Sequence, residues 1–386
     1  MRVLFLADHR PDRAPGQRFR WEQYLPYLRA NGVECDVSFV LSEADDRVFY
    51  GRNDLWGKAK GALRAFDQRR VESSRAFLER YDVVFIHRRA LFYGPPVMER
   101  RIARARPKLV FDFDDAIWVP GASEANRLFG WLKYTHKTAE IVRLADLVIA
   151  GNPYLEDFAR REGARRIEVI PTTIDTEEYR PIPRHRDPSE PLCIGWTGSF
   201  STIVYFEHAL PALRRIKARY RDRVRFKVVG DGDYRVPELD IVGLPWRKET
   251  ELEDLREMDI GIMPLPPTEW CEGKCALKGL QYMALGIPTV MSPVGVNTDV
   301  LEDGVDGYLA GSEEDWVQRL SELIDDAELR RRLGEAGRET VEKHYSVHSQ
   351  RERYLNVLRS LAGEVPSTTG HGRERRSKPE ATSSSD

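Results

Sequence analysis

Two lysines and a cysteine stand just before a predicted helix in the segment KCALKGLQYMALGIPTV, whose glycine and proline predict the helix end. The first turn of a helix has N–H groups without partners and the positive end of the helix dipole, so it stabilises an anion. Gly273 lets the chain approach a ligand closely, and Lys274 and Lys278 add full positive charges. The segment therefore predicts a diphosphate site. The alternative is a polar loop in which both lysines are only solvated.

A second group of reactive side chains is the acidic run VFDFDDAIWVP, which contains Asp112, Asp114 and Asp115. Three carboxylates within four residues can be metal ligands or can include a general base. On an extended segment Asp112 and Asp114 point to one side and Asp115 to the other, so we expect that the three do not form one constellation. The alternative for Asp115 is that it caps the next helix.

Short apolar runs alternate with amphipathic helical stretches along the whole chain, which is typical of parallel strands joined by crossovers. The first half has predicted strands at 2–7, 35–40, 82–87, 108–113, 146–151 and 167–171. The second half has them at 192–198, 224–230, 240–244, 259–265, 287–292 and 307–310. This pattern predicts an α/β protein with two doubly wound, Rossmann-like domains that face each other across a cleft. Ligands of such sheets bind outside the carboxyl ends of the strands.

The pattern divides the chain of 386 residues into segments. We expect an N-terminal domain at 1–178, a linker rich in proline and charge at 179–190 and a C-terminal domain at 191–345. A helical segment at 346–365 can cross back to the first domain, and residues 366–386, which lack large apolar side chains, are expected to be a disordered tail.

The overall composition is 41% hydrophobic and 32% charged, with 60 basic and 62 acidic residues. The formal charge of -2 argues against a general nucleic-acid binder. The four cysteines lack the spacing of a zinc site and are interpreted as reduced thiols. The N-terminus predicts a buried strand, not a signal peptide, and no apolar run is long enough to span a membrane. We expect a cytoplasmic protein that can lie at the inner face of the membrane.

Several motifs resemble those of the family 4 glycosyltransferases, which have the GT-B fold. LQYMALGIPTVMSPVG followed by VLEDGVDGYLA resembles the donor-binding region, and NPYLEDFARREGA with IEVIPTTIDTEEYRP resembles the end of the N-terminal domain. The resemblance covers residues 1–361. It implies a retaining, metal-independent transferase of the hexosyltransferase type, as in polysaccharide biosynthesis. A nucleotide-diphosphate sugar would be the donor substrate, with no cofactor, and a glycan, lipid-linked saccharide or small molecule would provide the acceptor hydroxyl.

This chain departs from the family at the donor site. The family carries two glutamates there, and the matching positions are Gly273 and Gln281. Gln281 can still hydrogen-bond ribose hydroxyls, or it can be a helix-surface residue that faces water. Glu272, or a residue of the other domain, would have to replace the first carboxylate.

Other site residues follow from the resemblance. Those expected at the diphosphate and nucleotide are Gly198, Gly230, Gly232, Trp246, Arg247, Gly273, Lys274, Cys275, Ala276, Leu277, Lys278 and Gln281. Asp114 or Asp115 is expected at the sugar or acceptor. Gly16, Arg18 and Arg20 form a candidate phosphate or acceptor loop, although the arginines can pair with Glu22 or the aspartates instead. His87 is a candidate for the acceptor site, although a histidine at a strand end is more often structural.

Residues 51–108 contain 15 basic and 6 acidic side chains, interleaved with Trp56, Leu63, Phe66 and Phe77. Such a segment indicates a surface for anionic lipid or a polyanionic acceptor, and the alternative is a solvated helix face. Two rival functions stay open: a nucleotide-sugar epimerase or hydrolase of the same fold, and a non-catalytic nucleotide-sugar-binding protein. A nicotinamide oxidoreductase is disfavoured because no G-x-G-x-x-G follows the first strand.

Overall fold

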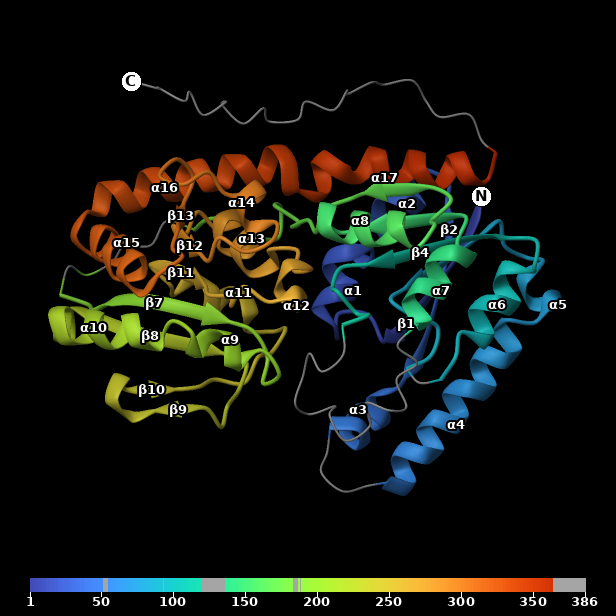
Figure 1. Ribbon diagram of the computed structural model, residues 1–386, viewed down its shortest axis with the longest axis horizontal. Helices are drawn as coiled ribbons and strands as arrows, with labels where there is room; N and C mark the ends of the chain where they lie inside the picture. The colour runs from blue at the N-terminus through green and yellow to red at the C-terminus, as the bar shows by residue number, and fades with distance from the viewer. Residues whose placement is uncertain (51–54, 93, 120–135, 183–186, 188, 364–386) are drawn as a thin grey trace.

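Two parallel sheets lie side by side in the computed structural model, which describes residues 1–50, 55–92, 94–119, 136–182, 187 and 189–363 (Figure 1). The expected tail at 366–386 lies outside the described residues, as does part of the expected linker. The two sheets confirm the predicted α/β fold with two Rossmann-like domains. No helix in the described part of the chain has both the length and the apolar character that a membrane span requires.

The N-terminal sheet has the strand order β2-β1-β3-β4-β5-β6, and all of its pairs are parallel. Its strands are β1 (Arg2–His9), β2 (Glu34–Leu41), β3 (Val83–His87), β4 (Lys108–Phe113), β5 (Leu147–Ala150) and β6 (Ile167–Val169). Its helices are α1 (Pro15–Arg20), α2 (Leu25–Ala30), α3 (Glu43–Tyr50), α4 (Leu55–Glu72), α5 (Arg75–Leu78), α6 (Val97–Ala103), α7 (Lys137–Leu144) and α8 (Pro153–Arg161). The central strands are buried on both faces, which is why they read as continuous apolar runs.

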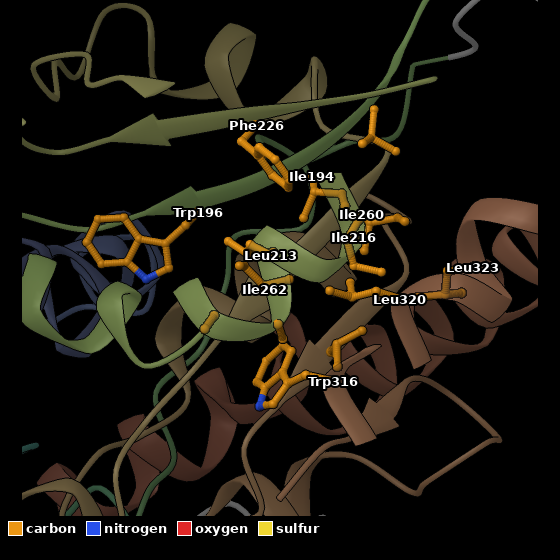
Figure 2. Close-up of a cluster of buried hydrophobic side chains, with 14 of the residues drawn as sticks. Ile194, Trp196, Leu213, Ile216, Phe226, Ile260, Ile262, Trp316, Leu320 and Leu323 are labelled. Atoms are coloured by element: carbon orange, nitrogen blue, oxygen red, sulfur yellow. The ribbon is translucent and has the colours of Figure 1, made fainter. Parts of the chain in front are cut away.

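The C-terminal sheet has the order β13-β12-β11-β7-β8 and is also parallel. Its strands are β7 (Leu192–Thr197), β8 (Val224–Val229), β11 (Ile260–Met263), β12 (Thr289–Met291) and β13 (Tyr308–Leu309). Its helices are α9 (Ile203–Glu207), α10 (Leu210–Tyr220), α11 (Glu251–Arg256), α12 (Glu269–Glu272), α13 (Leu277–Ala284), α14 (Asn297–Val300), α15 (Glu313–Asp325) and α16 (Ala327–Thr340). Figure 2 shows one face of this sheet, where Ile194 and Ile262 meet Leu213 of α10 and Leu320 of α15.

The expected strand at 240–244 is wrong as a member of the parallel sheet. Residues Ile241–Val242 form β10, which pairs antiparallel with β9 (Arg235–Val236). The left-handed backbone of Asp240, with φ of 55°, turns the chain back on β9, and only Leu244 reaches β8 through a single bridge to Val229. Pro245 follows directly and has no N–H with which to extend a ladder.

The last helix, α17 (Val347–Leu361), leaves the C-terminal domain and lies against the N-terminal one (Figure 1). The Ser346 side chain caps it by accepting from the Ser349 N–H. Tyr354 stacks on Tyr24 with ring centroids 4.4 Å apart, and Leu358 is fully buried beside the strands of the first sheet. This apolar contact ties the two ends of the chain together and fixes the carboxyl edges of the two sheets near each other.

Candidate functional site

The turn from β11 to α13 faces the N-terminal domain and carries the predicted diphosphate residues. Thr268 caps the short helix α12, and the chain then passes through Ala276, whose left-handed backbone (φ 55°) is strained for a residue with a side chain. Ala276 is the N-cap of α13 and offers no side-chain acceptor, so the first N–H groups of α13 have no side-chain cap. Leu277 is the first residue of this helix.

The two lysines are not simply solvated. Lys274 is 16% exposed, its Nζ lies 2.9 Å from Asp115 Oδ1 of the other domain, and it lies 4.9 Å from the Trp270 ring centroid. Lys278 is half-buried, lies 5.5 Å from the Trp196 ring centroid and has no carboxylate partner among the described residues. Burial, followed by the charge of Lys274, lowers the pKa of Lys278 to about 8. This part of the interface therefore holds positive charge that is only partly neutralised.

The acidic run supplies partners for cations of both domains. Asp112 is fully buried; its Oδ1 lies 2.5 Å from Arg20 Nη2, and its Oδ2 lies 2.8 Å from His87 Nδ1. Asp114 Oδ1 accepts from Arg88 Nε at 2.7 Å. Within the described residues, no group of three or more His, Cys, Asp or Glu side chains is arranged to hold a metal ion. Asp112 thus has a structural position, whereas Asp114 and Asp115 reach the domain interface.

The expected separation of Asp115 from Asp114 is wrong, whereas Asp112 has a partner of its own in Arg20. Arg88 contacts both Asp114 and Asp115, and His87 lies 2.8 Å from Asp112 and 3.8 Å from Asp114. The alternation of an extended strand ends with β4 at Phe113, so it does not govern the turn that follows. Helix capping also fails for Asp115, because its carboxylate pairs with Arg88 and Lys274.

Burial alone would raise the pKa values of Asp112 and Asp114, but nearby cations outweigh it. Arg20 and then His87 hold the pKa of Asp112 below its usual value. Arg88, followed by His87 and Arg20, does the same for Asp114. Both groups are therefore carboxylates at neutral pH, so Asp114 can accept a hydrogen bond or a proton but cannot donate one.

The predicted phosphate or acceptor loop is divided between two networks. Arg20 pairs with Asp112, which agrees with the alternative that the arginines pair with the aspartates. Arg18 crosses the interface, where its Nη2 binds the Glu251 carboxylate and donates to the Tyr179 hydroxyl at 2.6 Å. Gly16 fits tightly, because a Cβ there would lie 3.1 Å from both Arg88 Nη2 and Asp114 Oδ2. The loop therefore does not form a single group of free cations.

Arg18, Tyr179, Trp246, Glu251 and Gln281 form a buried polar network that we call the Glu251 cluster. Gln281 Nε2 donates to Glu251 Oε1 at 3.1 Å and to the Tyr179 hydroxyl at 3.2 Å, and Trp246 Nε1 donates to Glu251 Oε1 at 3.2 Å. Gln281 is only 4% exposed, so its interpretation as a water-facing surface residue is wrong. Arg18 Nε and Nη1 are buried with no partner in the described residues.

Gly273 explains the close approach of the two domains. A Cβ at this position would lie 2.7 Å from both the N and the Cβ of Ala116, so a glutamate does not fit here without movement. Cys275 inserts beside Gly151 and donates from Sγ to Asp114 O at 3.3 Å, and burial raises the pKa of its thiol far above the usual value. Glu272 is half-buried, and its side chain makes no hydrogen bond or ion pair in the described part of the chain.

The remaining predicted residues lie at the ends of β7 and β8. Gly198 and Gly230 lie back to back, since a Cβ on Gly230 would lie 2.6 Å from Gly198 C. Gly232 lies beside Pro245, where a Cβ would be 3.3 Å from Pro245 Cδ. Arg247 is exposed and makes no hydrogen bond or ion pair with described residues. These contacts bring the two strand ends together, and Arg247 takes no part in the Lys274–Asp115 ion pair.

Sequence reasoning missed two residues of this interface, Arg88 and Glu251. Each is one charged side chain among many in a charged stretch, and its partners stand far away in the sequence: Asp115 is 27 residues from Arg88, and Arg18 is 233 residues from Glu251. One signal was available for Arg88, because it directly follows a predicted strand whose carboxyl end was expected to face the ligand.

Comparison with solved structures shows the fold. The sucrose-phosphate synthase of Thermosynechococcus elongatus superposes with a TM-score of 0.66 at 15% identity, covering 94% of this chain and 99% of that chain. Anabaena Alr3699/HepE in complex with UDP and glucose gives a TM-score of 0.63 at 17% identity, covering 93% and 100%. In sequence, the sulfoquinovosyl transferase SQD2 of Arabidopsis thaliana is 23% identical, covering 85% of this chain and 68% of that protein.

The two sheets, their facing carboxyl ends and these likenesses show the GT-B fold. Residues 191–326 match the family model described as Glycosyl transferases group 1. Over these residues the C-terminal domain is similar to glycosyl transferases group 1.

Proposed function

We propose that this protein transfers a sugar from a nucleotide-diphosphate sugar to an acceptor hydroxyl, with retention at the anomeric carbon and without a metal ion. The observation that carries the proposal is the cationic turn at the start of α13, where Lys274 meets the other domain and Lys278 has no carboxylate partner among the described residues. Anabaena Alr3699/HepE, which has this fold, has been crystallised with UDP-glucose, and this supports a donor of that class.

The chemistry requires stabilisation of a leaving group. Cleavage of the bond between the anomeric carbon and the diphosphate places negative charge on the phosphate oxygens, and fixed cations and N–H groups stabilise that charge. In our proposal, Lys274, Lys278 and the backbone from Gly273 to Leu277 provide this environment. Asp114, Asp115 and Glu272 are the carboxylates proposed to face the sugar and the acceptor.

Gln281 is proposed to bind the ribose through one atom of its amide. Its Nε2 is engaged by Glu251 and Tyr179, whereas its Oε1 accepts no hydrogen bond from a described residue. Oε1 can therefore accept from a ribose hydroxyl without disruption of the Glu251 cluster.

The test is a thermal-shift screen of the full chain against UDP, GDP, ADP and dTDP sugars, followed by product analysis. A ligand that binds only the folded state stabilises it by about 2.7 kcal/mol at a hundredfold excess over Kd, so one base is expected to raise the melting temperature by several degrees. Free sugar or a changed sugar formed without acceptor would favour the hydrolase or epimerase. Tight binding without turnover across donors and acceptors would favour the non-catalytic protein.

The acceptor is proposed to be a lipid-linked saccharide at an anionic membrane surface. Helix α4 presents exposed Trp56 (89%), Leu63 (67%) and Phe66 beside exposed Lys60 and Arg70. In Figure 1 it projects from the lower edge of the N-terminal domain. Apolar side chains next to lysine and arginine are typical of helices that bind anionic lipid headgroups.

We expect the protein to co-sediment with vesicles of phosphatidylcholine and phosphatidylglycerol, and much less with phosphatidylcholine alone. The double variant Trp56→Ser and Leu63→Ser is expected to weaken this association about tenfold or more, because both side chains lose apolar contact with the membrane. Val242→Ser, at another exposed apolar position (61% exposed), is the matched control. Equal sedimentation of all three proteins would show that α4 is only a solvated helix.

A further inference from the structure

Arg88 has features that its place at the end of β3 does not require. Its backbone is left-handed, with φ of 62°, a conformation that is unfavourable for a residue with a side chain and recurs at functional sites. Its N–H donates to Asp112 O at 2.7 Å, which fixes this conformation beside β4. The guanidinium consequently points at the interface between the domains, where it meets Asp114 and Asp115.

Asp115 joins one cation of each domain. Its Oδ2 lies 2.5 Å from Arg88 Nη2, and its Oδ1 lies 2.9 Å from Lys274 Nζ. Its side chain is only 14% exposed. A carboxylate that bridges two cations offers them the same paired oxygen acceptors as a phosphate group.

The cations here also exceed the carboxylates. Arg88, Lys274 and Lys278 face Asp114 and Asp115, and Lys278 has no carboxylate of its own among the described residues. The segment after β7, residues 198–210, contains no lysine or arginine that could contribute further charge. A diphosphate in this group would therefore depend on a cation from the N-terminal domain.

We propose that Arg88 binds the donor's diphosphate together with Lys274, and that Asp115 occupies their shared position until the diphosphate displaces it. This inference rests on the proposed donor site and adds to it a phosphate-binding residue from the N-terminal domain. It also explains how a lysine already paired with a carboxylate can serve a phosphate: the ligand exchanges one anionic partner for another. Binding of the diphosphate then depends on both domains at once.

The experiment measures, by calorimetry on the full chain, the affinity for the nucleoside diphosphate that the screen identifies and for its parent nucleoside. Arg88→Met is expected to weaken diphosphate binding about tenfold or more and to leave nucleoside binding unchanged, because charge-assisted hydrogen bonds to phosphate are lost. Arg88→Lys keeps the charge but not the planar fork, so its diphosphate affinity is expected to lie between those of the unaltered protein and Arg88→Met. Asp115→Asn is expected to tighten diphosphate binding severalfold, because a competing anion is removed.

Arg100→Met is the matched control, since it removes one arginine from an ion pair with Glu140 elsewhere in the same domain and should change neither affinity. If Arg88→Met does not fold, Arg88→Lys and Asp115→Asn carry the test. Unchanged diphosphate affinity in the folded Arg88 and Asp115 variants, with weaker binding by Lys274→Ala, would overturn this inference and leave the donor site standing. Absence of binding by the unaltered protein to all four diphosphates would overturn both.

Discussion

Lys274→Ala is expected to lower turnover of the nucleotide-sugar donor by about 10²–10³-fold, the loss typical when one preorganised group that stabilises developing charge is removed. Lys274 lies at the interface, 2.9 Å from Asp115, beside Lys278, which has no carboxylate partner in the described residues. Without it, the leaving diphosphate meets one full positive charge less when the bond to the anomeric carbon breaks. The measurement is kcat with the donor that the thermal-shift screen identifies.

Calorimetry on the same proteins separates binding from chemistry. Both Lys274→Ala and Gln281→Ala are expected to weaken nucleotide binding, the first by loss of a phosphate contact and the second by loss of a ribose contact. Lys217→Ala is the matched control. Lys217 lies on α10, pairs with Asp240 and contacts no residue of the interface in the described structure. If neither Lys274→Ala nor Gln281→Ala changed the affinity, the proposed donor site would be refuted.

Much of the fold could be predicted because parallel strands covered on both faces are continuous apolar runs. The run at 82–87 contains β3, and the run at 108–113 coincides with β4. The run at 240–244 looks similar, but Asp240 reverses the chain and Pro245 stops the ladder. Apolar composition shows that a segment is buried, whereas its strand partners depend on turn geometry that the pattern does not encode.

The place where the two domains meet could be predicted, because the carboxyl ends of strands in both domains were expected to face each other. Lys274 and Asp115 are 159 residues apart and form an ion pair at that place. What the sequence could not provide was the partner of each charged side chain. Asp112 and Asp114 are alike in sequence, yet Asp112 is fixed by Arg20 and Asp114 by Arg88.

Gly273, which stands where the resemblance implies a glutamate, illustrates the same limit. In the sequence it looked like the loss of a sugar-binding carboxylate. In the structure, the missing side chain is what lets Ala116 approach to a distance that no Cβ at position 273 would allow. The same approach brings Asp114 and Asp115 of the N-terminal domain next to Lys274 and Cys275. Carboxylates from the other domain therefore lie close to the position where the family places its own.

Asp112→Ala is expected to lower the free energy of unfolding of the N-terminal domain by about 3–5 kcal/mol, the usual result of removing one partner of a buried ion pair. Asp112 is fully buried, and Arg20, 1% exposed, lies 2.5 Å from it. Without the carboxylate, the Arg20 guanidinium keeps only the Ile170 carbonyl, at 2.6 Å, as a hydrogen-bond acceptor among the described residues. His87 Nδ1 also loses its partner. Chemical denaturation of the full chain measures the loss.

The pH dependence and two controls identify the cause. Because the folded state lowers the pKa of Asp112, its contribution is present above the unfolded pKa of about 4 and is lost as the pH falls through the folded value. The difference in free energy of unfolding between the natural protein and Asp112→Asn should therefore shrink in acid.

Asp157→Ala, at a 65% exposed carboxylate paired with Arg160, is expected to change stability by at most about 1 kcal/mol. The double variant Arg20→Met and Asp112→Asn should lose less free energy of unfolding than the two single variants added together, since no buried charge is left unpaired. Equal effects of Asp112→Ala and Asp157→Ala would show that the Asp112–Arg20 pair does not stabilise the N-terminal domain.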